Sequence, residues 1–268
     1  FEECNHLLSS LLQFWTDLKG PDHIEVAEVA AALAKVYVNQ GLYDAAATLY
    51  AQVIEVIGHK LQYDPMANHN TGSSLNVIYC RVLIGVAGVY TQQGHFADAV
   101  ASLKQAKAVF SNSVDPAHPL LIDYYLCYGH LRMVVGQPVL AQSFYQDSLD
   151  RALAIYCKHH PVVAKCMSWL GEAAIEQGKW AEASGYIEES LYIRLKTLSD
   201  DHPEVAASEC AKGKLLAILG KYEDALVIAE RALVSQRSVL GQRHPDVAES
   251  LAVLAAVSHG KGQPKEAL

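Results

Sequence analysis

The sequence lacks the features that mark membrane, exported and nucleic-acid-binding proteins. No stretch approaches eighteen consecutive apolar residues, so we expect no transmembrane helix, and no basic segment followed by an apolar run opens the chain. No run of five basic residues occurs, and the formal net charge is −8. The lack of a long apolar run predicts a soluble protein. Because neutralising phosphates requires clustered Lys and Arg, we also expect no nucleic-acid partner. The start at "FEECNHLL", without methionine, suggests a piece of a longer chain.

Motifs that would predict catalysis are also missing. The sequence has no GxSxG, no glycine-rich loop ending in GK[ST] and no HExxH, and no Cys, His and acid trio that the chain's periodicity would bring together. We therefore predict that the chain is not an enzyme and binds no cofactor. Catalysis would require a further domain outside this sequence.

Cysteine and histidine are present but not in ligand patterns. The six cysteines form no CxxC pair, which is typical of buried free thiols in a reducing compartment and favours a cytoplasmic protein. Of the twelve histidines, only His159 and His160 are adjacent. Zinc needs three or four converging ligands at ~2 Å, so we predict no metal site.

What the sequence does contain is a period of 42 residues. A His-Pro pair recurs at this interval, a glycine recurs at the same interval, and an alanine follows each of those glycines by five residues. The histidines are His118, His160, His202 and His244; the glycines are Gly94, Gly136, Gly178, Gly220 and Gly262; the alanines are Ala99, Ala141, Ala183, Ala225 and Ala267. Gly41 and Ala46 have the same spacing. Self-similarity at this length indicates a solenoid.

Each unit of the period predicts a helical hairpin. Apolar residues have helical spacing between His-Pro and the glycine, and again between the glycine and the next His-Pro. Proline suits the first turn of a helix, where its missing N–H leaves no hydrogen bond unmade. Glycine suits the turn that closes the first helix. The alanine fits a close helix crossing, where a larger side chain would overpack.

The phase of the repeat gives the domain organisation. We predict an all-α fold of about twelve antiparallel helices that forms a single solenoid over residues 1–268. An orphan second helix spans 1–19, and a first helix of a truncated repeat spans 244–260. Five hairpins lie between them, at 23–61, 76–112, 118–157, 160–199 and 202–240. The polar segment 62–74 exceeds the repeat length and is predicted to be an inserted loop.

Two stretches carry a family resemblance that covers essentially the whole chain. "GKYEDALVIAERALVSQRSVLGQRHPDVAESL" (220–251) and "GKWAEASGYIEESLYIRLKTLSDDHPEVA" (178–206) resemble the 42-residue tetratricopeptide repeat of kinesin light chains and their relatives. The resemblance implies a right-handed α-α superhelix (tetratricopeptide repeat solenoid) whose first helices line a concave groove that takes peptides or helices of partners. It also implies adaptor or scaffold work associated with microtubule motors, the cytoskeleton or cilia.

The sequence departs from that family at the positions that hold cargo peptides. Kinesin light chains typically carry an asparagine pair in the middle of each first helix, and no asparagine occupies the matching positions here. Those positions are Ala31 and Ala32, Ile84 and Gly85, Leu126 and Cys127, Ser168 and Trp169, Cys210 and Ala211, and Ala252 and Val253. The family's recognition of acidic, tryptophan-containing motifs is therefore not transferred.

The repeat phase predicts which side chains line the groove. They are Lys35, Asn39, Arg81, Gln92, His130, Lys165, Trp169, Glu172 and Lys214. Four of these are cations, which would steer an acidic segment of a partner, and the tryptophan would anchor an apolar side chain or stack on a cation. The alternative is that they are solvated charges beside one packed aromatic ring. His130 would tune binding near pH 6.5.

Two further interpretations stay open at this stage. The chain is alternatively a structural scaffold element that self-associates through its end surfaces or through Phe1 to Leu18. Three tyrosines on one first helix resemble an aromatic platform, although Tyr125 and Tyr128 are predicted to be buried between hairpins, while Tyr124 fits either role.

Overall fold

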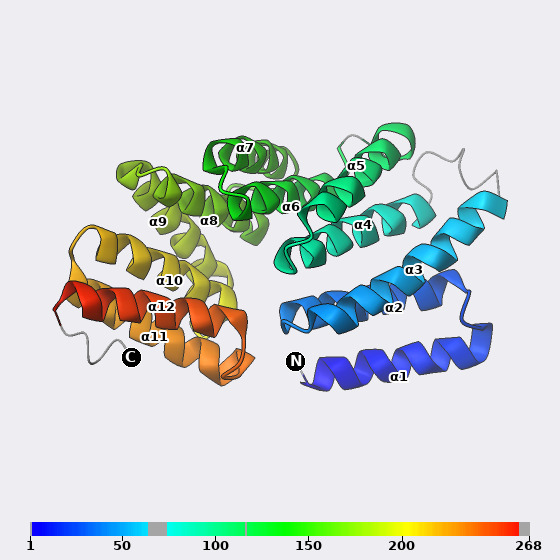
Figure 1. Cartoon of the computed structure of the whole chain (residues 1–268), viewed down its shortest axis with the longest axis horizontal. Coiled ribbons are helices and arrows are strands. Elements are labelled where there is room, and N and C mark those ends of the chain that lie inside the picture. Colours follow the sequence, from blue (N-terminus) through cyan, green and yellow to red (C-terminus); the bar gives the residue numbers. More distant parts are fainter. Residues whose placement is uncertain (1, 64–73, 116, 263–268) are drawn as a thin grey trace. The chain divides into compact units, whose positions relative to one another are not determined.

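The computed structural model describes residues 2–63, 74–115 and 117–262, and these residues form twelve α-helices (Figure 1). The helices are α1 (Glu2–Lys19), α2 (Ile24–Asn39), α3 (Tyr43–Tyr63), α4 (Ser74–Gln92), α5 (Phe96–Ser113), α6 (Leu120–Val134), α7 (Pro138–Ile155), α8 (Pro161–Glu176), α9 (Trp180–Thr197), α10 (Pro203–Ile218), α11 (Tyr222–Leu240) and α12 (Pro245–Gly260). Most of the predicted insert lies outside the described residues.

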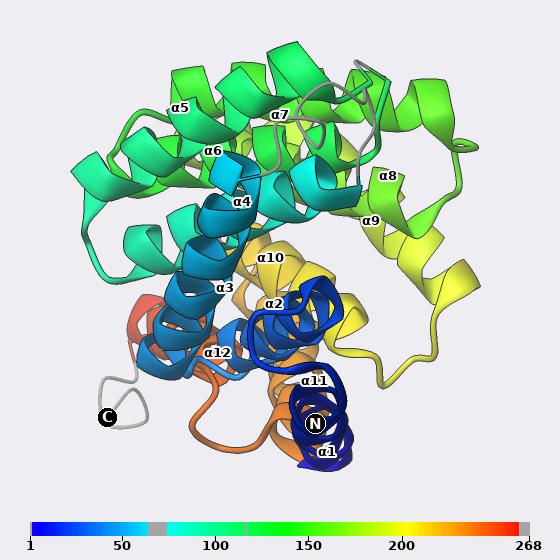
Figure 2. The same ribbon diagram turned by 90° about the vertical axis from the view of Figure 1, so that its right-hand side faces the viewer.

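The chain divides into two compact units, Phe1–Val135 and Gly136–Leu268, which we call the N-terminal and the C-terminal unit. In the N-terminal unit, α4 contacts both α2 and α6, and α1 packs on α2 at one end of the unit (Figures 1 and 2). In the C-terminal unit, α10 contacts both α8 and α12. The even-numbered helices are thus the first helices of the repeats, and they lie next to one another within each unit.

A histidine ring caps the start of five of the described first helices. In His23, His118, His160, His202 and His244, ring Nδ1 accepts the backbone N–H two residues further on, at 3.1–3.3 Å. The ring satisfies a donor that the helix itself leaves unpaired, a role usually taken by Ser, Thr, Asp or Asn. Both residues of the His-Pro pair therefore contribute to the start of the helix: the histidine caps it, and the proline lies at its first turn.

Proline follows this cap as predicted in three helices. Pro161, Pro203 and Pro245 are the first residues of α8, α10 and α12. Pro119 differs, because α6 begins one residue later and Pro119 is itself the N-cap residue. The glycine turns are confirmed: Gly41, Gly94, Gly136, Gly178, Gly220 and Gly262 all have a φ between 71° and 78°, a backbone conformation that disfavours residues with a Cβ atom.

Small residues allow the helices of each hairpin to approach closely. Ala46, Ala99, Ala141, Ala183 and Ala225 are all 0% exposed, as predicted for a crossing point. Glycines on first helices serve the same purpose: a Cβ atom at Gly171 would lie 2.7 Å from Cγ1 of Ile187, and one at Gly85 would lie 2.5 Å from the ring of Tyr50. Substitution at these glycines forces a neighbouring side chain to move.

The core of the N-terminal unit contains a long apolar helix. The window Leu75–Gln92 in α4 is long and apolar enough to cross a membrane by length and composition, but 61% of it is buried inside the structure, as in the core helix of a folded domain. The tyrosine prediction needs correction. Tyr124 is the buried ring, 3% exposed and packed edge-to-face on Phe110, while Tyr125 and Tyr128 are only partly buried. The turn of the helix points Tyr124 at the preceding hairpin.

A buried arginine joins three helices of the C-terminal unit. The Arg194 side chain on α9 is 5% exposed, and its guanidinium donates to Ser168 on α8 and to Ser208 and the carbonyl oxygen of Glu204 on α10. Its Nε lies 3.5 Å from the Glu204 carboxylate. These partners offset the cost of burying a charge, since an isolated guanidinium would not be tolerated here.

Candidate partner-binding face

The candidate site is the surface of first helices in the C-terminal unit, which we call the C-terminal first-helix face. It consists of the predicted residues Lys165, Trp169, Glu172 and Lys214, together with Glu176 and Glu249. The first helices α8, α10 and α12 position these side chains, because each helix contacts the next and repeats the same register. The structure thus brings residues from three repeats onto neighbouring helices.

Lys214 of α10 is the centre of an ion-pair cluster on this face. Its ammonium lies 3.0 Å from Oε1 of Glu176 and 3.5 Å from Oε2 of Glu172, both on α8. The side chain of Glu172 is 18% exposed, that of Lys214 33% and that of Glu176 49%, so the cluster opens to solvent through Glu176. The positive charge of Lys214 is already matched, and a free cation for an acidic partner is therefore not supported here.

Burial and neighbouring charges shift the pKa values of Glu172, Lys214 and Glu249. Burial raises the pKa of Glu172, Lys214 opposes this, and the charge of Glu176 adds to it. Burial alone would lower the pKa of Lys214, but the carboxylates of Glu172 and Glu176 raise it overall. Burial and the charge of Glu172 also raise the pKa of Glu249 on α12. The raised pKa values of Glu172 and Glu249 thus follow mainly from burial, with a smaller contribution from neighbouring carboxylates.

The ring of Trp169, the predicted aromatic anchor, is partly packed inside the C-terminal unit. The ring of Trp169 stacks on Tyr145 of α7, with centroids 5.8 Å apart and an interplanar angle of 25°. Tyr145 is fully buried, whereas Trp169 is partly exposed. One face of the indole is therefore packed, as the alternative interpretation of the sequence expected. Lys165 lies one turn before Trp169 on α8 and is also partly exposed.

The predicted residues of the N-terminal unit lie on three first helices. Lys35 and Asn39 are exposed on α2, and Arg81 and Gln92 are exposed on α4. The structure brings one pair together: Nε2 of Gln92 lies 3.1 Å from Nε2 of His130 on α6. Burial lowers the pKa of His130, so its ring is neutral at physiological pH.

The described part of the chain offers no arrangement for metal binding, since no group of three or more His, Cys, Asp or Glu side chains converges there. Burial raises the pKa values of Cys80 and Cys210 to about 12 each, so both thiols stay protonated. A protonated, buried thiol is a poor nucleophile.

Comparison with known proteins identifies the repeat. Models of the tetratricopeptide repeat match residues 166–233 and 30–61. The chain contains tetratricopeptide repeats. No curated protein matches the sequence significantly.

Several solved structures share the fold. BtubC (BKLC) from P. vanneervenii is similar with a TM-score of 0.62 and 21% identity, covering 84% of this chain and 86% of that one. The tetratricopeptide-like repeats of a putative kinesin light chain from Podosopora anserina give 0.54 and 24%, covering 70% and 89%. A Rap protein complexed with competence and sporulation factor gives 0.64 and 14%, covering 90% and 71%.

These comparisons confirm the predicted resemblance to tetratricopeptide repeat domains of the kinesin light chain type, and they confirm the all-α solenoid fold. Tetratricopeptide repeats support a protein-interaction scaffold and are typically non-catalytic. The predicted division into hairpins of one solenoid and the predicted groove residues remain predictions.

Two residues of the candidate site escaped the sequence analysis. Glu176 and Glu249 complete the acidic cluster, yet neither was predicted to line the groove. The signal was present in the repeat phase, because Glu176 follows Glu172 by one helical turn and Glu249 stands two periods of 42 residues after Lys165.

Proposed function

We propose that the chain is a non-catalytic adaptor or scaffold whose first helices bind a peptide or helix of a protein partner. The tetratricopeptide fold supports this, and a Rap protein of similar fold is known in complex with competence and sporulation factor. Hairpins that are already folded avoid much of the ordering cost that a flexible receptor would meet on binding. Work with a microtubule motor, the cytoskeleton or a cilium is part of the same proposal, supported by the likeness to the putative kinesin light chain repeats.

The observation that carries the partner's chemistry is the cluster around Lys214. Lys214 forms ion pairs with Glu172 and Glu176, and the carboxylate of Glu249 interacts electrostatically with Glu172 and Lys214. A basic side chain of the partner would lower the electrostatic cost of these carboxylates, whereas an acidic one would raise it. We therefore propose that the bound segment presents a Lys or Arg to the C-terminal first-helix face, in place of the acidic segment predicted from the sequence.

Charge reversal distinguishes the two partner chemistries. Proteins captured from cell extract by the wild type are compared by mass spectrometry with those captured by a Glu176→Lys/Glu249→Lys variant and a Lys165→Glu/Lys214→Glu variant. We expect the first variant to lose the partner. Glu230→Lys on the second helix α11 is the control, because Glu230 is exposed and lies on the other helix of its hairpin. Loss of the partner only with the Lys165→Glu/Lys214→Glu variant would support an acidic partner segment instead. Equal capture by all variants would show that the C-terminal first-helix face does not bind the partner.

A second candidate function is self-association through α1. Leu7, Leu11, Phe14 and Leu18 form an apolar stripe on this helix and are 41–68% exposed. Exposed apolar stripes of this kind mark contact surfaces. Light scattering should show oligomers that a Leu7→Glu/Phe14→Glu variant converts to monomers; a monomeric wild type would exclude this function.

We also propose a cytoplasmic location. All six cysteines are free, and three of them, Cys80, Cys166 and Cys210, are buried. Free thiols are stable in a reducing compartment. Imaging of a fluorescent fusion in cells tests this location.

A further inference from the structure

The five histidine caps depend on a lone pair of electrons that acid removes. In each cap the ring accepts a backbone N–H through Nδ1. Histidine takes up a proton at about pH 6.5, and both ring nitrogens of the charged form are donors. In a protonated cap, an N–H of the ring would therefore face an N–H of the backbone. The charged ring would also lie at the positive end of the helix dipole.

Two of the caps have a carboxylate beside Nδ1. In His244, Nδ1 lies 3.5 Å from Oδ1 of Asp246, and in His23 it lies 3.6 Å from Oε2 of Glu25. Each carboxylate belongs to the second residue after the histidine. It offers an acceptor and an opposite charge to a protonated ring, and so offsets the loss of the cap. We call His23 and His244 the paired caps.

The other three histidines, which we call the lone caps, have no such carboxylate partner among the described residues. Leu120 and Val162 are apolar at the position that Asp246 has in the last repeat. Glu204 occupies this position in α10, but its carboxylate lies 3.5 Å from Nε of the buried Arg194. The lone caps are His118, His160 and His202, and all three side chains are partly exposed, so solvent protons reach them.

The junction at His160 shows the arrangement of a lone cap. The ring stacks on Tyr156 with centroids 4.2 Å apart and an interplanar angle of 11°. The stacking holds Nδ1 at 3.2 Å from the backbone nitrogen of Val162, at the start of α8. The charged groups of this junction, Lys158 and Glu189 of α9, pair with each other at 3.3 Å. Protonation of the ring would therefore create a charge without a partner.

Charged groups near the other two lone caps are also engaged. At His202, the guanidinium of Arg194 on α9 donates to a carbonyl oxygen in the first turn of α10 at 2.9 Å, which places a positive charge close to the cap. Asp201 precedes this histidine in the chain. At His118, the carboxylate of Asp115 accepts a backbone N–H at 2.8 Å. Like charge near His202 disfavours a protonated ring.

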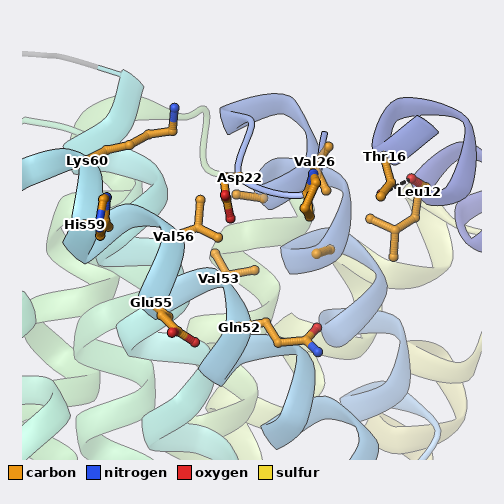
Figure 3. Close-up of a pocket in the computed structure, with 13 residues that line it drawn as sticks. Leu12, Thr16, Asp22, Val26, Gln52, Val53, Glu55, Val56, His59 and Lys60 are labelled. Atoms are coloured by element: carbon orange, nitrogen blue, oxygen red, sulfur yellow. Dashed lines mark hydrogen bonds between the residues drawn. The ribbon is translucent and has the colours of Figure 1, made fainter. Parts of the chain in front are cut away.

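The junction at His23 carries charges of both signs. The carboxylate partner of His23 also pairs with Lys19 of α1. Asp22, which precedes the histidine, lines a pocket together with His59 and Lys60 of α3 (Figure 3). The other paired cap, at the start of α12, is therefore the clearer example.

We infer that the repeat junctions form an acid-sensitive device, in which the lone caps release their backbone N–H groups below about pH 6.5 while the paired caps hold. The first turns of α6, α8 and α10 then loosen, and those of α2 and α12 do not. Lys165 of the C-terminal first-helix face lies just after the first turn of α8, so the device acts on the surface that we propose for the partner. It rests on the caps alone and not on what binds there.

Replacing lone caps by residues that do not titrate is the test. Asparagine caps helices well at any pH of this range. The wild type and a His160→Asn/His202→Asn variant are unfolded in urea at about pH 7.5 and about pH 5.5, on either side of the histidine range. On acidification, the unfolding equilibrium constant of the wild type should rise roughly ten-fold more than that of the variant, since each cap contributes a factor of about three to five. Carboxylates such as Glu172 titrate in both proteins, and their effect cancels in the comparison.

His95→Asn is the matched control, because His95 is the N-cap residue of α5 but its side chain makes no capping hydrogen bond. This variant should keep the pH dependence of the wild type. An equal response of the wild type and the double variant to acid would overturn the inference. An effect of His95→Asn as large as that of one lone cap would overturn it too, because acid would then act through the general positive charge of the chain.

Moving the carboxylate tests the difference between the two kinds of cap. Val162→Glu places an acid at the position of Asp246 and should reduce the acid response by roughly three-fold relative to Val162→Gln, which has the same size without the charge. Asp246→Asn should make the cap at His244 acid-sensitive and increase the response by a similar factor. Equal acid responses of Val162→Glu and Val162→Gln would contradict the role given to the neighbouring carboxylate.

Discussion

The histidine before five of the described first helices is a helix cap, and four of these five histidines are followed by proline. Ring Nδ1 must keep its lone pair to accept a backbone N–H, so the proton of the neutral ring lies on Nε2. Proline at the next position fixes φ for the first turn of the helix, and its missing N–H leaves no hydrogen bond unmade there. A short His-Pro pair thus starts a helix and ends the preceding connection.

Removing one cap tests this role. We expect His202→Ala to lower the free energy of unfolding by about 1 kcal/mol, because the N–H of Glu204 loses its acceptor. His202→Asn should retain most of the stability, since an asparagine side chain caps helices well. Urea denaturation followed by circular dichroism measures both. Equal losses in the two variants would show that the ring contributes by packing instead of capping.

The acidic cluster gives a stability that depends on pH. The pKa of Glu172 is raised in the folded protein, so the folded state holds its proton more tightly than the unfolded state. Stability therefore falls as pH rises from the ordinary glutamate value of about 4.5 through the raised pKa of Glu172. Glu249 shifts in the same direction but is more exposed, and its contribution is smaller.

Glu172→Gln removes this titration. In urea denaturation at a series of pH values, the variant should lose less stability than the wild type as pH rises above about 4.5. The matched variant Glu230→Gln should follow the wild type, because Glu230 is exposed on α11. Parallel curves for the wild type and Glu172→Gln would contradict the assigned burial of this carboxyl.

At the scale of the element, each hairpin depends on how closely its two helices approach. Alanine on the second helix and glycine or alanine on the first let the backbones come together, as Ala183 and Gly171 do where α8 meets α9. The side chain of Ile187 then fills the space above Gly171. Shape, more than polarity, limits substitution at these positions.

Two glycines of one hairpin give opposite predictions. Gly171→Ala places a Cβ atom 2.7 Å from Cγ1 of Ile187, and the overpacking cost of about 1–3 kcal/mol exceeds the gain in helix propensity of about 1 kcal/mol. Gly185→Ala on α9 meets nothing within 4 Å and should stabilise by up to about 1 kcal/mol. Chemical denaturation ranks the two variants. A stabilised Gly171→Ala would show that Ile187 moves aside freely.

At the scale of the molecule, stability is distributed along a row of neighbours. Within each unit, most described helices pack mainly on neighbouring helices of the repeats, so the stability of a unit is close to a sum of hairpin and interface terms. The unit ends have fewer neighbours. Within the described chain, α1 packs chiefly on α2 and exposes Leu7, Phe14 and Leu18.

Hydrogen exchange should follow this distribution. We expect the amides of α1 to exchange faster than those of α4, whose window Leu75–Gln92 is mostly buried. Mass spectrometry of peptic fragments after deuterium labelling measures both helices in one experiment. Protection of α1 equal to that of α4 would indicate a partner on the apolar stripe of α1, as the self-association function requires.

The period of 42 residues in the sequence determined the repeat class, the twelve helices and the turn glycines, because each of these depends on local backbone preferences and on spacing along one helix. Tertiary structure alone decided three other features. Lys214 is neutralised by two carboxylates from the neighbouring repeat, Tyr124 and not Tyr125 is the buried ring, and a pocket opens beside α1, α2 and α3. Each of these features depends on which side chains of neighbouring helices contact one another. The repeat phase gives the position of a residue on its own helix, but not the size or charge of the side chains that it meets on the next helix.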